Sequence, residues 1–199
     1  MKLYASPGSP FARKVRVTIL ELDLEDRIAV EMIQPRQRPP GYDEINPLGK
    51  VPALVLDDGT KLIDSPLICE YLNEVVGDGR LMPGDKGDRW AIRNLAALGD
   101  GIMDAAVLIR QEGMRPPALV SSDWIDAQCE KVIRGFKSLA ETLPETENRM
   151  DLGTITVICC LDWVKLRFSD TNWWRPFPRL DAWREGFSGY RSLRETMPV

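Results

Sequence analysis

The sequence NPLGKVPAL, residues 46–54, leads from a polar loop into a short apolar strand. An X-Pro bond such as Val51–Pro52 is cis in only about 5% of cases in folded proteins, so base rates favour an ordinary trans proline at a strand start. A cis bond would instead leave the backbone N–H and C=O of Val51 free to pair with an extended, peptide-like ligand. The residues alone leave both interpretations open.

Strand and helix patterns alternate on both sides of this stretch. Before it, the sequence predicts a strand over 2–5, a helix over 10–22 with one apolar stripe, and a strand over 28–33. After it, apolar segments at 51–56 and 61–63 flank an Asp-Asp-Gly turn, which is typical of a hairpin, and a second helix follows. The order β-α-β-loop-β-β-α predicts an α/β domain over residues 1–78.

The remainder of the chain has only helical patterns. Residues 76–88 are rich in glycine, aspartate and proline and are predicted to be a linker. Helical periodicity then covers 86–113, 122–143, 151–168 and 179–188, with prolines between these stretches. We therefore expect an all-α domain over residues 86–199.

The charge balance argues against a polyanionic partner. Lysine and arginine number 26 against 30 aspartates and glutamates, a net charge of −4 in 199 residues, and no basic block stands out. Nucleic acid is therefore not an expected partner. No apolar run is long enough for a bilayer, and the first residues lack the pattern of a secretory signal, so no membrane contact is expected either.

The sequence contains no histidine and four cysteines. The absence of histidine excludes Ser-His-Asp and Cys-His catalysis and histidine-ligated metals. The cysteines form no C-x-x-C pair, which argues against a zinc ribbon or a dithiol redox motif, so no metal site is predicted. Unpaired thiols favour a reducing, cytoplasmic setting.

Two predicted helix starts carry hydroxyl groups, Ser9-Pro10 and Asp64-Ser65-Pro66. A helix N-terminus presents unpaired N–H groups and stabilises an anion, to which a hydroxyl can also donate. Asp64 could pair with an ammonium group, so a zwitterionic end of a ligand would satisfy both members of the second pair. Each serine taken by itself is equally explained as a cap of its own helix.

Taken together, these segments resemble the glutathione S-transferase family. The runs SPFARKVRV from Ser9, NPLGKVPAL from Asn46 and DSPLICEYL from Asp64 match it in order and spacing. The resemblance implies a thioredoxin-like α/β N-terminal domain followed by an all-α helical-bundle C-terminal domain. It covers essentially the whole chain and is most specific in the first eighty or so residues.

The resemblance implies a role for individual residues of the first domain. Ser9 lies where serine-type members keep the catalytic hydroxyl that stabilises the glutathione thiolate; Ser6, in the same turn, is the alternative. Val51 matches the residue whose backbone pairs with the cysteinyl part of glutathione, and Pro52 matches the cis proline beside it.

Four further positions complete the implied site. Asp64 and Ser65 match the acidic-serine pair that holds the γ-glutamyl end of glutathione, with Asp where Glu is commoner. Lys50 lies where a basic or amide side chain approaches the tripeptide, and Arg13 matches the basic residue that often follows the catalytic serine.

The function implied is that of a cytoplasmic, homodimeric, detoxifying glutathione transferase, with glutathione as co-substrate and a small electrophile as second substrate. A free thiol has a pKa near 8.5, and lowering it by one or two units takes about 1.4–2.7 kcal/mol. A charge-assisted hydrogen bond of about 1.5–3 kcal/mol provides that without histidine. The alternatives are a non-catalytic interaction protein with the same fold and a glutathione-dependent thiol reductase or peroxidase.

The helical half is less informative. Candidates for the second-substrate cleft are Met103, Asp104 and Leu108 on the first long helix and Trp163 and Arg167 on a later one, although core and surface roles explain them equally well. Trp173 and Trp174 are interpreted as packing residues or a lid at the domain edge. At the start of the helix predicted over 151–168, Asp151 and Thr154 have the residue types of a capping box in reverse, so the reciprocal bond is left open.

Overall fold

The computed structural model describes residues 1–34, 36–143, 149–171, 173 and 175–198. Its N-terminal part holds a four-stranded sheet of β1 (Lys2–Ala5), β2 (Ala29–Met32), β3 (Ala53–Val55) and β4 (Lys61–Leu62), in the order β2-β1-β3-β4. β1 is parallel to β2 and antiparallel to β3, which pairs antiparallel with β4. The predicted strand order along the chain is confirmed.

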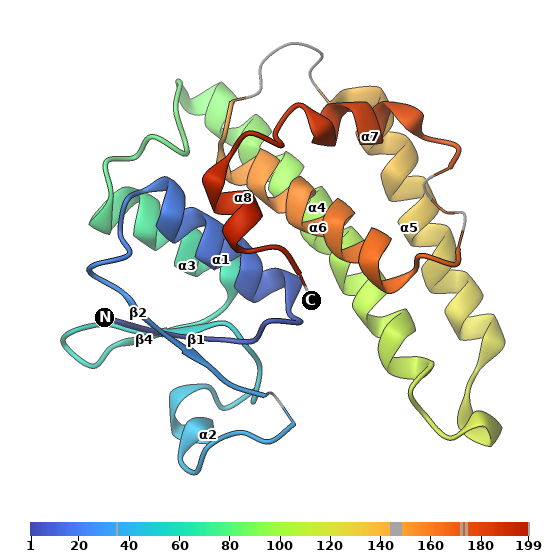
Figure 1. Ribbon diagram of the computed structural model, residues 1–199, viewed down its shortest axis with the longest axis horizontal. Helices are drawn as coiled ribbons and strands as arrows, with labels where there is room; N and C mark the ends of the chain where they lie inside the picture. Colours follow the sequence, from blue (N-terminus) through green and yellow to red (C-terminus); the bar gives the residue numbers. More distant parts are fainter. Residues whose placement is uncertain (35, 144–148, 172, 174, 199) are drawn as a thin grey trace.

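Helices cover both faces of this sheet (Figure 1). α1 (Pro10–Glu21) and α3 (Ser65–Tyr71) lie on one face, and a π-helical turn (Leu72–Val76) continues α3. The short α2 (Tyr42–Ile45) lies on the other face, where Tyr42 is buried with Ile33 and Ala53. The sequence predicted a plain loop there; the burial of Tyr42, a tertiary contact, fixes this single turn.

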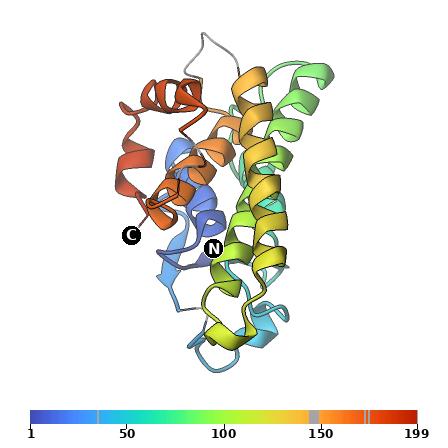
Figure 2. The ribbon, with the colours of Figure 1, turned by 90° about the vertical axis from the view of Figure 1, so that its right-hand side faces the viewer.

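The second half is helical, as predicted. It contains α4 (Lys86–Glu112), α5 (Ser122–Thr142), α6 (Leu152–Arg167), α7 (Pro178–Glu185) and α8 (Arg191–Glu195), with a 3-10 turn (Pro117–Leu119) before α5. Figure 2 shows α4 and α5 side by side as the longest pair of helices. The first four follow the predicted ranges within about three residues, and α8 was missed because five residues carry too little periodicity to be recognised.

α6 is the central helix of the molecule. Its residues from Leu152 to Val164 are buried, Asp162 slightly less so than the others with a side chain 8% exposed, so the helix is enclosed on all sides. It begins with a capping box in which the Asp151 carboxylate accepts from the Thr154 N–H and the Thr154 hydroxyl accepts from the Asp151 N–H, both at 2.8 Å. The reversed residue types therefore still satisfy both N–H groups.

α1 joins the sheet to the helical half. It packs against α6 and α8, and one hydrophobic core runs through both halves of the chain. Lys14 Nζ lies 2.6 Å from the Asp100 carboxylate on α4. Because α1 is fixed from both sides, its N-terminus has a defined position at the boundary between the halves. Among the described helices, none is long and apolar enough to cross a membrane.

Candidate functional site

Ser9 is the N-cap of α1. Its backbone is extended, with φ −92° and ψ 120°, and its Oγ accepts a hydrogen bond from the Ala12 N–H at 3.2 Å. This bond uses a lone pair of the hydroxyl and leaves its hydrogen available for an anion at the start of the helix. The Ser9 N–H donates to the Ser6 carbonyl at 3.2 Å, so both serines belong to one turn, and Ser6 is the more buried of the two.

The backbone of Val51 has unused hydrogen-bonding groups beside a cis peptide bond. The Val51–Pro52 bond is cis, as the resemblance implied. Within the described residues, neither the N–H nor the C=O of Val51 takes part in a hydrogen bond. The preceding carbonyl, that of Lys50, is held by the Tyr42 hydroxyl at 2.7 Å and by the Asn46 amide at 2.8 Å. The loop is therefore anchored while Val51 keeps a donor and an acceptor available.

Ser65 opens α3 with an unsatisfied hydroxyl. The Asp64 carboxylate caps the helix by accepting from the Ser65 N–H. The Ser65 side chain is 0% exposed, and its Oγ has no hydrogen-bond partner in the described part of the chain. A buried hydroxyl without a partner is costly, so this position is suited to a ligand that supplies an acceptor.

Carboxylates on α4 lie in the electrostatic field of the α3 start. Burial and the negative charge of Asp64 raise the pKa of Asp104, while Lys50 and Lys14 lower it. Burial also raises the pKa of Asp100, against the effect of Lys14. Asp104 thus belongs to the surroundings of Asp64 and Lys50. That acidic neighbourhood attracts an ammonium group.

The structure does not bring Arg13 to this site. Its side chain is 1% exposed, and its Nη2 lies 2.9 Å from the Asp162 carboxylate of α6 and 3.3 Å from the Leu193 carbonyl. Arg184 approaches the same carboxylate at 2.7 Å. Arg13 therefore ties α1 to the helical half, and the expected contact with the ligand is corrected to this structural role. A sequence motif cannot show it because the acidic partner lies on another helix far along the chain.

The second-substrate candidates separate into two groups. Met103 is fully buried in the core, and Leu108 is partly exposed on α4. Trp163 is also buried, but its Nε1 donates to the Gly8 carbonyl at 2.9 Å, directly before Ser9. Arg167 reaches the same turn, since its Nη2 lies 3.3 Å from the position that a Cβ on Gly8 would occupy.

Aromatic rings extend from Trp163 along this side of the molecule. Phe168 packs edge-on against Trp163 and, tilted, against Trp173, with ring centroids 6.1 and 4.5 Å apart. Trp173 is therefore a packing residue, and Trp174 lies outside the described residues.

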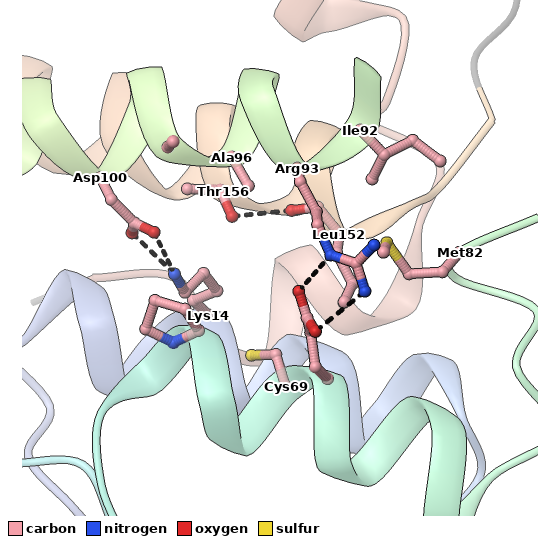
Figure 3. A pocket seen from close by; sticks show the side chains of 12 residues that line it. Lys14, Cys69, Met82, Ile92, Arg93, Ala96, Asp100, Leu152 and Thr156 are labelled. Carbon is pink, nitrogen blue, oxygen red and sulfur yellow. Dashed lines mark hydrogen bonds and ion pairs between the residues drawn. The ribbon is translucent and has the colours of Figure 1, made fainter. Parts of the chain in front are cut away.

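A separate hollow of about 180 Å³ lies between α4 on one side and α1 and α3 on the other (Figure 3). The Lys14–Asp100 and Arg93–Glu70 pairs lie at its edge. Burial raises the pKa of the Cys69 thiol there to about 11, so the thiol stays protonated near neutral pH. This hollow holds neither Ser9 nor Ser65 and is not a candidate reaction site. Within the described ranges, no group of three or more potential metal ligands comes together.

Comparison with known proteins agrees with this geometry. Residues 3–78 match the model of the glutathione S-transferase N-terminal domain. The uncharacterised GST-like protein YibF of Escherichia coli K12 is 33% identical over 201 aligned positions, covering 100% of this chain and 98% of YibF. The chain belongs to the glutathione S-transferase family.

Solved structures of the glutathione S-transferase family are also similar to this chain. A family member from Pseudomonas fluorescens Pf-5, solved with bound glutathione, is 38% identical, with a TM-score of 0.92 over 100% of this chain and 98% of its own. It was also solved with bound S-(propanoic acid)-glutathione. A glutathione S-transferase from Methylobacillus flagellatus, solved with glutathione, is 34% identical, with a TM-score of 0.91 over 100% and 99% of the two chains. The fold of this chain is therefore that of the family throughout.

Proposed function

We propose that this protein is a glutathione transferase that binds glutathione along Val51, Asp64 and Ser65 and activates its thiol beside Ser9. In this arrangement the backbone of Val51 pairs with the cysteinyl residue, next to the cis Pro52. The γ-glutamyl carboxylate accepts from the Ser65 hydroxyl, and its ammonium group faces Asp64. Lys50, which is exposed beside Val51, would pair with the remaining carboxylate.

The observation that carries the proposal is the Ser65 hydroxyl, which is buried and has no partner among the described residues. Removing an unsatisfied hydroxyl would stabilise an empty protein, so its presence is explained by a ligand acceptor. Relatives with bound glutathione supply that acceptor chemistry.

Ser9 is suited to hold a thiolate. Its hydroxyl lies at the N-terminus of α1, where a charge-assisted hydrogen bond of about 1.5–3 kcal/mol and a helix-end effect of about 0.3–1 kcal/mol would act on the same anion. The sum lowers a thiol pKa of about 8.5 by one or two units. The thiolate then attacks an electrophilic carbon and forms the carbon–sulfur bond.

The thiol reductase alternative has less support in the geometry. A mixed disulfide needs a protein thiol at the site, and the corresponding position is Ser9. Cys69, Cys159 and Cys160 are buried, and burial raises the pKa of each thiol. The non-catalytic alternative remains the competitor, because binding of glutathione does not by itself demonstrate turnover.

Calorimetric titration with glutathione and with S-methylglutathione tests the proposal. We expect both to bind, and we expect thiolate absorbance of bound glutathione to appear below the pKa of the free thiol. Absence of binding at millimolar ligand would contradict the proposal and favour the interaction protein. Ser9→Ala and Ser6→Ala, titrated in parallel, identify the thiolate partner, because only its removal returns the thiol pKa toward the free value.

The remaining proposals concern the domain bounds, the oligomeric state and the cellular location of the protein. We propose that residues 1–78 form the glutathione-binding domain, that residues 86–199 form the helical domain, and that two copies form a homodimer, which sedimentation equilibrium would test. All four cysteines are free, which supports the proposed cytoplasmic location.

A further inference from the structure

β2 forms one edge of the sheet, and part of its backbone has no neighbouring strand. In the order β2-β1-β3-β4, β2 pairs only with β1. The N–H groups of Ala29 and Ile33 donate toward β1, to carbonyls 3.1 and 2.8 Å away. Because the backbone groups of successive residues in a strand point to opposite edges, those of Val30 and Met32 point away from β1. Within the described sheet, these two residues therefore offer their N–H and C=O groups to a further strand.

An apolar hollow of about 210 Å³ lies beside this edge. Val30 and Met32 line it from β2 and are 41% and 45% exposed, whereas Ile19 and Leu20 line it from α1. Side chains along a strand alternate between the two faces of a sheet. A segment added to β2 would therefore direct every second side chain into this β2 hollow.

The β2 hollow also carries a positive charge, on Arg16 of α1. In the described part of the chain, no carboxylate lies within ion-pair distance of Arg16, and its Nη2 makes only a long hydrogen bond, 3.5 Å, to the Glu195 carbonyl. The two acids that line the hollow, Glu25 and Glu195, pair with Arg191 at 3.3 and 2.7 Å. Arg191, together with the charge of Arg194, lowers the pKa of the Glu195 carboxyl. The acids are therefore compensated, whereas the guanidinium of Arg16 is not.

We propose that β2 and the β2 hollow bind an extended peptide segment of a partner protein, which adds to the sheet as a further strand and brings a carboxylate to Arg16. Hydrogen bonds to the backbone of Val30 and Met32 give affinity, and the hollow selects apolar side chains at alternate positions. The guanidinium selects an acidic side chain or a C-terminal carboxylate. The proposal does not depend on glutathione binding, because neither Ser9 nor Ser65 lines this hollow.

A second copy of this chain is a less suitable occupant. Along β2 and the residue before it, Ile28, Val30 and Met32 line the hollow, and none of them is acidic. A second β2 paired at this edge would therefore leave Arg16 without a counter-ion. The antiparallel register that sets Val30 against Met32 would also set Glu31 against Glu31, and like charges directly opposite each other are unfavourable.

A structural explanation also exists, because every open sheet ends in an edge strand and single exposed apolar side chains are common. It predicts that no peptide slows hydrogen exchange at the Val30 and Met32 amides and that the charge of a peptide has no effect. The docking proposal predicts protection of these two amides and a preference for an acidic peptide that requires Arg16. The two explanations are therefore separable by matched peptides.

The experiment follows the amides of the isotope-labelled protein by two-dimensional NMR during titration with synthetic peptides. The probe acetyl-EVTVTVE-amide has an acid at each end, which accommodates either strand direction, and acetyl-QVTVTVQ-amide is its uncharged counterpart. We expect the acidic peptide to slow hydrogen exchange of the Val30 and Met32 amides. Its Kd should be about tenfold lower than that of the uncharged peptide, the size of one charge-assisted hydrogen bond. The peptide acetyl-QVTVTV, with a free C-terminus, tests a terminal carboxylate as the source of the charge.

Two pairs of variants assign the contacts. Met32→Pro removes the outward N–H together with the side chain, whereas Met32→Ala removes the side chain alone, and an edge strand tolerates proline where its N–H faces solvent. We expect Met32→Pro to bind the acidic peptide about fivefold more weakly than Met32→Ala, the size of one hydrogen bond. Arg16→Met removes the preference for the acidic peptide, whereas Arg134→Met, at an exposed position of α5, keeps it.

Each contrary result has its own meaning. Equal Kd values for the acidic and uncharged peptides, or no protection of Val30 and Met32 by any of the three peptides, would overturn the proposal. Protection that grows with protein concentration in the absence of peptide would overturn it in favour of a second copy. If Met32→Pro loses the dispersed spectrum of a folded protein, the peptide preference and its dependence on Arg16 decide by themselves. Glutathione added to the same samples should leave these two amides unchanged, so failure of glutathione binding is detected separately.

Discussion

Replacing Ser65 with alanine has opposite expected effects on the empty and the liganded protein. The Ser65 hydroxyl is 0% exposed and has no partner among the described residues. An unsatisfied buried hydroxyl costs about 1–3 kcal/mol. We therefore expect Ser65→Ala to stabilise the ligand-free protein by about 1 kcal/mol, which raises the Tm of a chain of this size by about 2–4 °C.

Glutathione affinity should change in the other direction. Once the Ser65 side chain turns to the γ-glutamyl carboxylate, it donates a charge-assisted hydrogen bond of about 1.5–3 kcal/mol. Its loss raises the Kd for glutathione about 10- to 150-fold. Turnover at saturating glutathione should stay within about twofold, because the contact is made equally in the ground and transition states.

Calorimetric titration and thermal unfolding, each with and without glutathione, measure both effects. Ser122→Ala is the matched control, because Ser122 is also the first residue of a helix, α5, but is exposed. It should leave the affinity unchanged. A Kd for Ser65→Ala within twofold of the native value would refute the binding role. A lower Tm of the ligand-free variant would show that the hydroxyl already has a partner, and a defect confined to the rate at saturation would contradict the reasoning.

Four further predictions follow from the described contacts. Ser9→Ala should raise the pKa of bound glutathione thiol by one to two units, seen by ultraviolet titration, and cost about 1 kcal/mol of stability through the lost cap; an unchanged thiol pKa contradicts the assignment. Asp162→Asn leaves two arginines facing a neutral group and should cost about 3–5 kcal/mol in urea unfolding; a loss below about 1 kcal/mol would disprove this. Burial raises the pKa of the Asp151 carboxyl, so its contribution to stability is lost as the pH rises from the unfolded pKa of about 3.9 through the higher folded pKa. The free energy of unfolding, measured against pH by urea unfolding, should therefore fall less over this range in Asp151→Asn than in the native protein; equal falls in the two proteins would refute this. Gly135→Ala would place a methyl 2.4 Å from Ile102 and should cost about 1–3 kcal/mol, measured by thermal unfolding, with no loss as the contrary result.

Much of the fold follows from local patterns in the sequence. The helix starts at Ser9-Pro10 and Asp64-Ser65-Pro66 combine an N-cap with a proline in the first turn, so the chain enters a helix there irrespective of its surroundings. The long helices have several turns of periodic apolar residues, which is why their ranges were predictable. By contrast, α2 and α8 are too short for a periodic signal and depend on what they pack against.

By itself the sequence determined the order of strands and helices, the absence of histidine chemistry, and the serines and the Val51–Pro52 segment from which the site is built. Only the tertiary structure decided which of these groups already have partners. Arg13 matched a ligand residue until the fold paired it with Asp162. For Ser65, the residues alone left a helix cap and a ligand contact as alternatives, and the fold buried its hydroxyl without an acceptor among the described residues. The physical reason is that backbone preferences act over a few neighbouring residues, whereas burial and ion pairing depend on segments that meet only after the chain has folded.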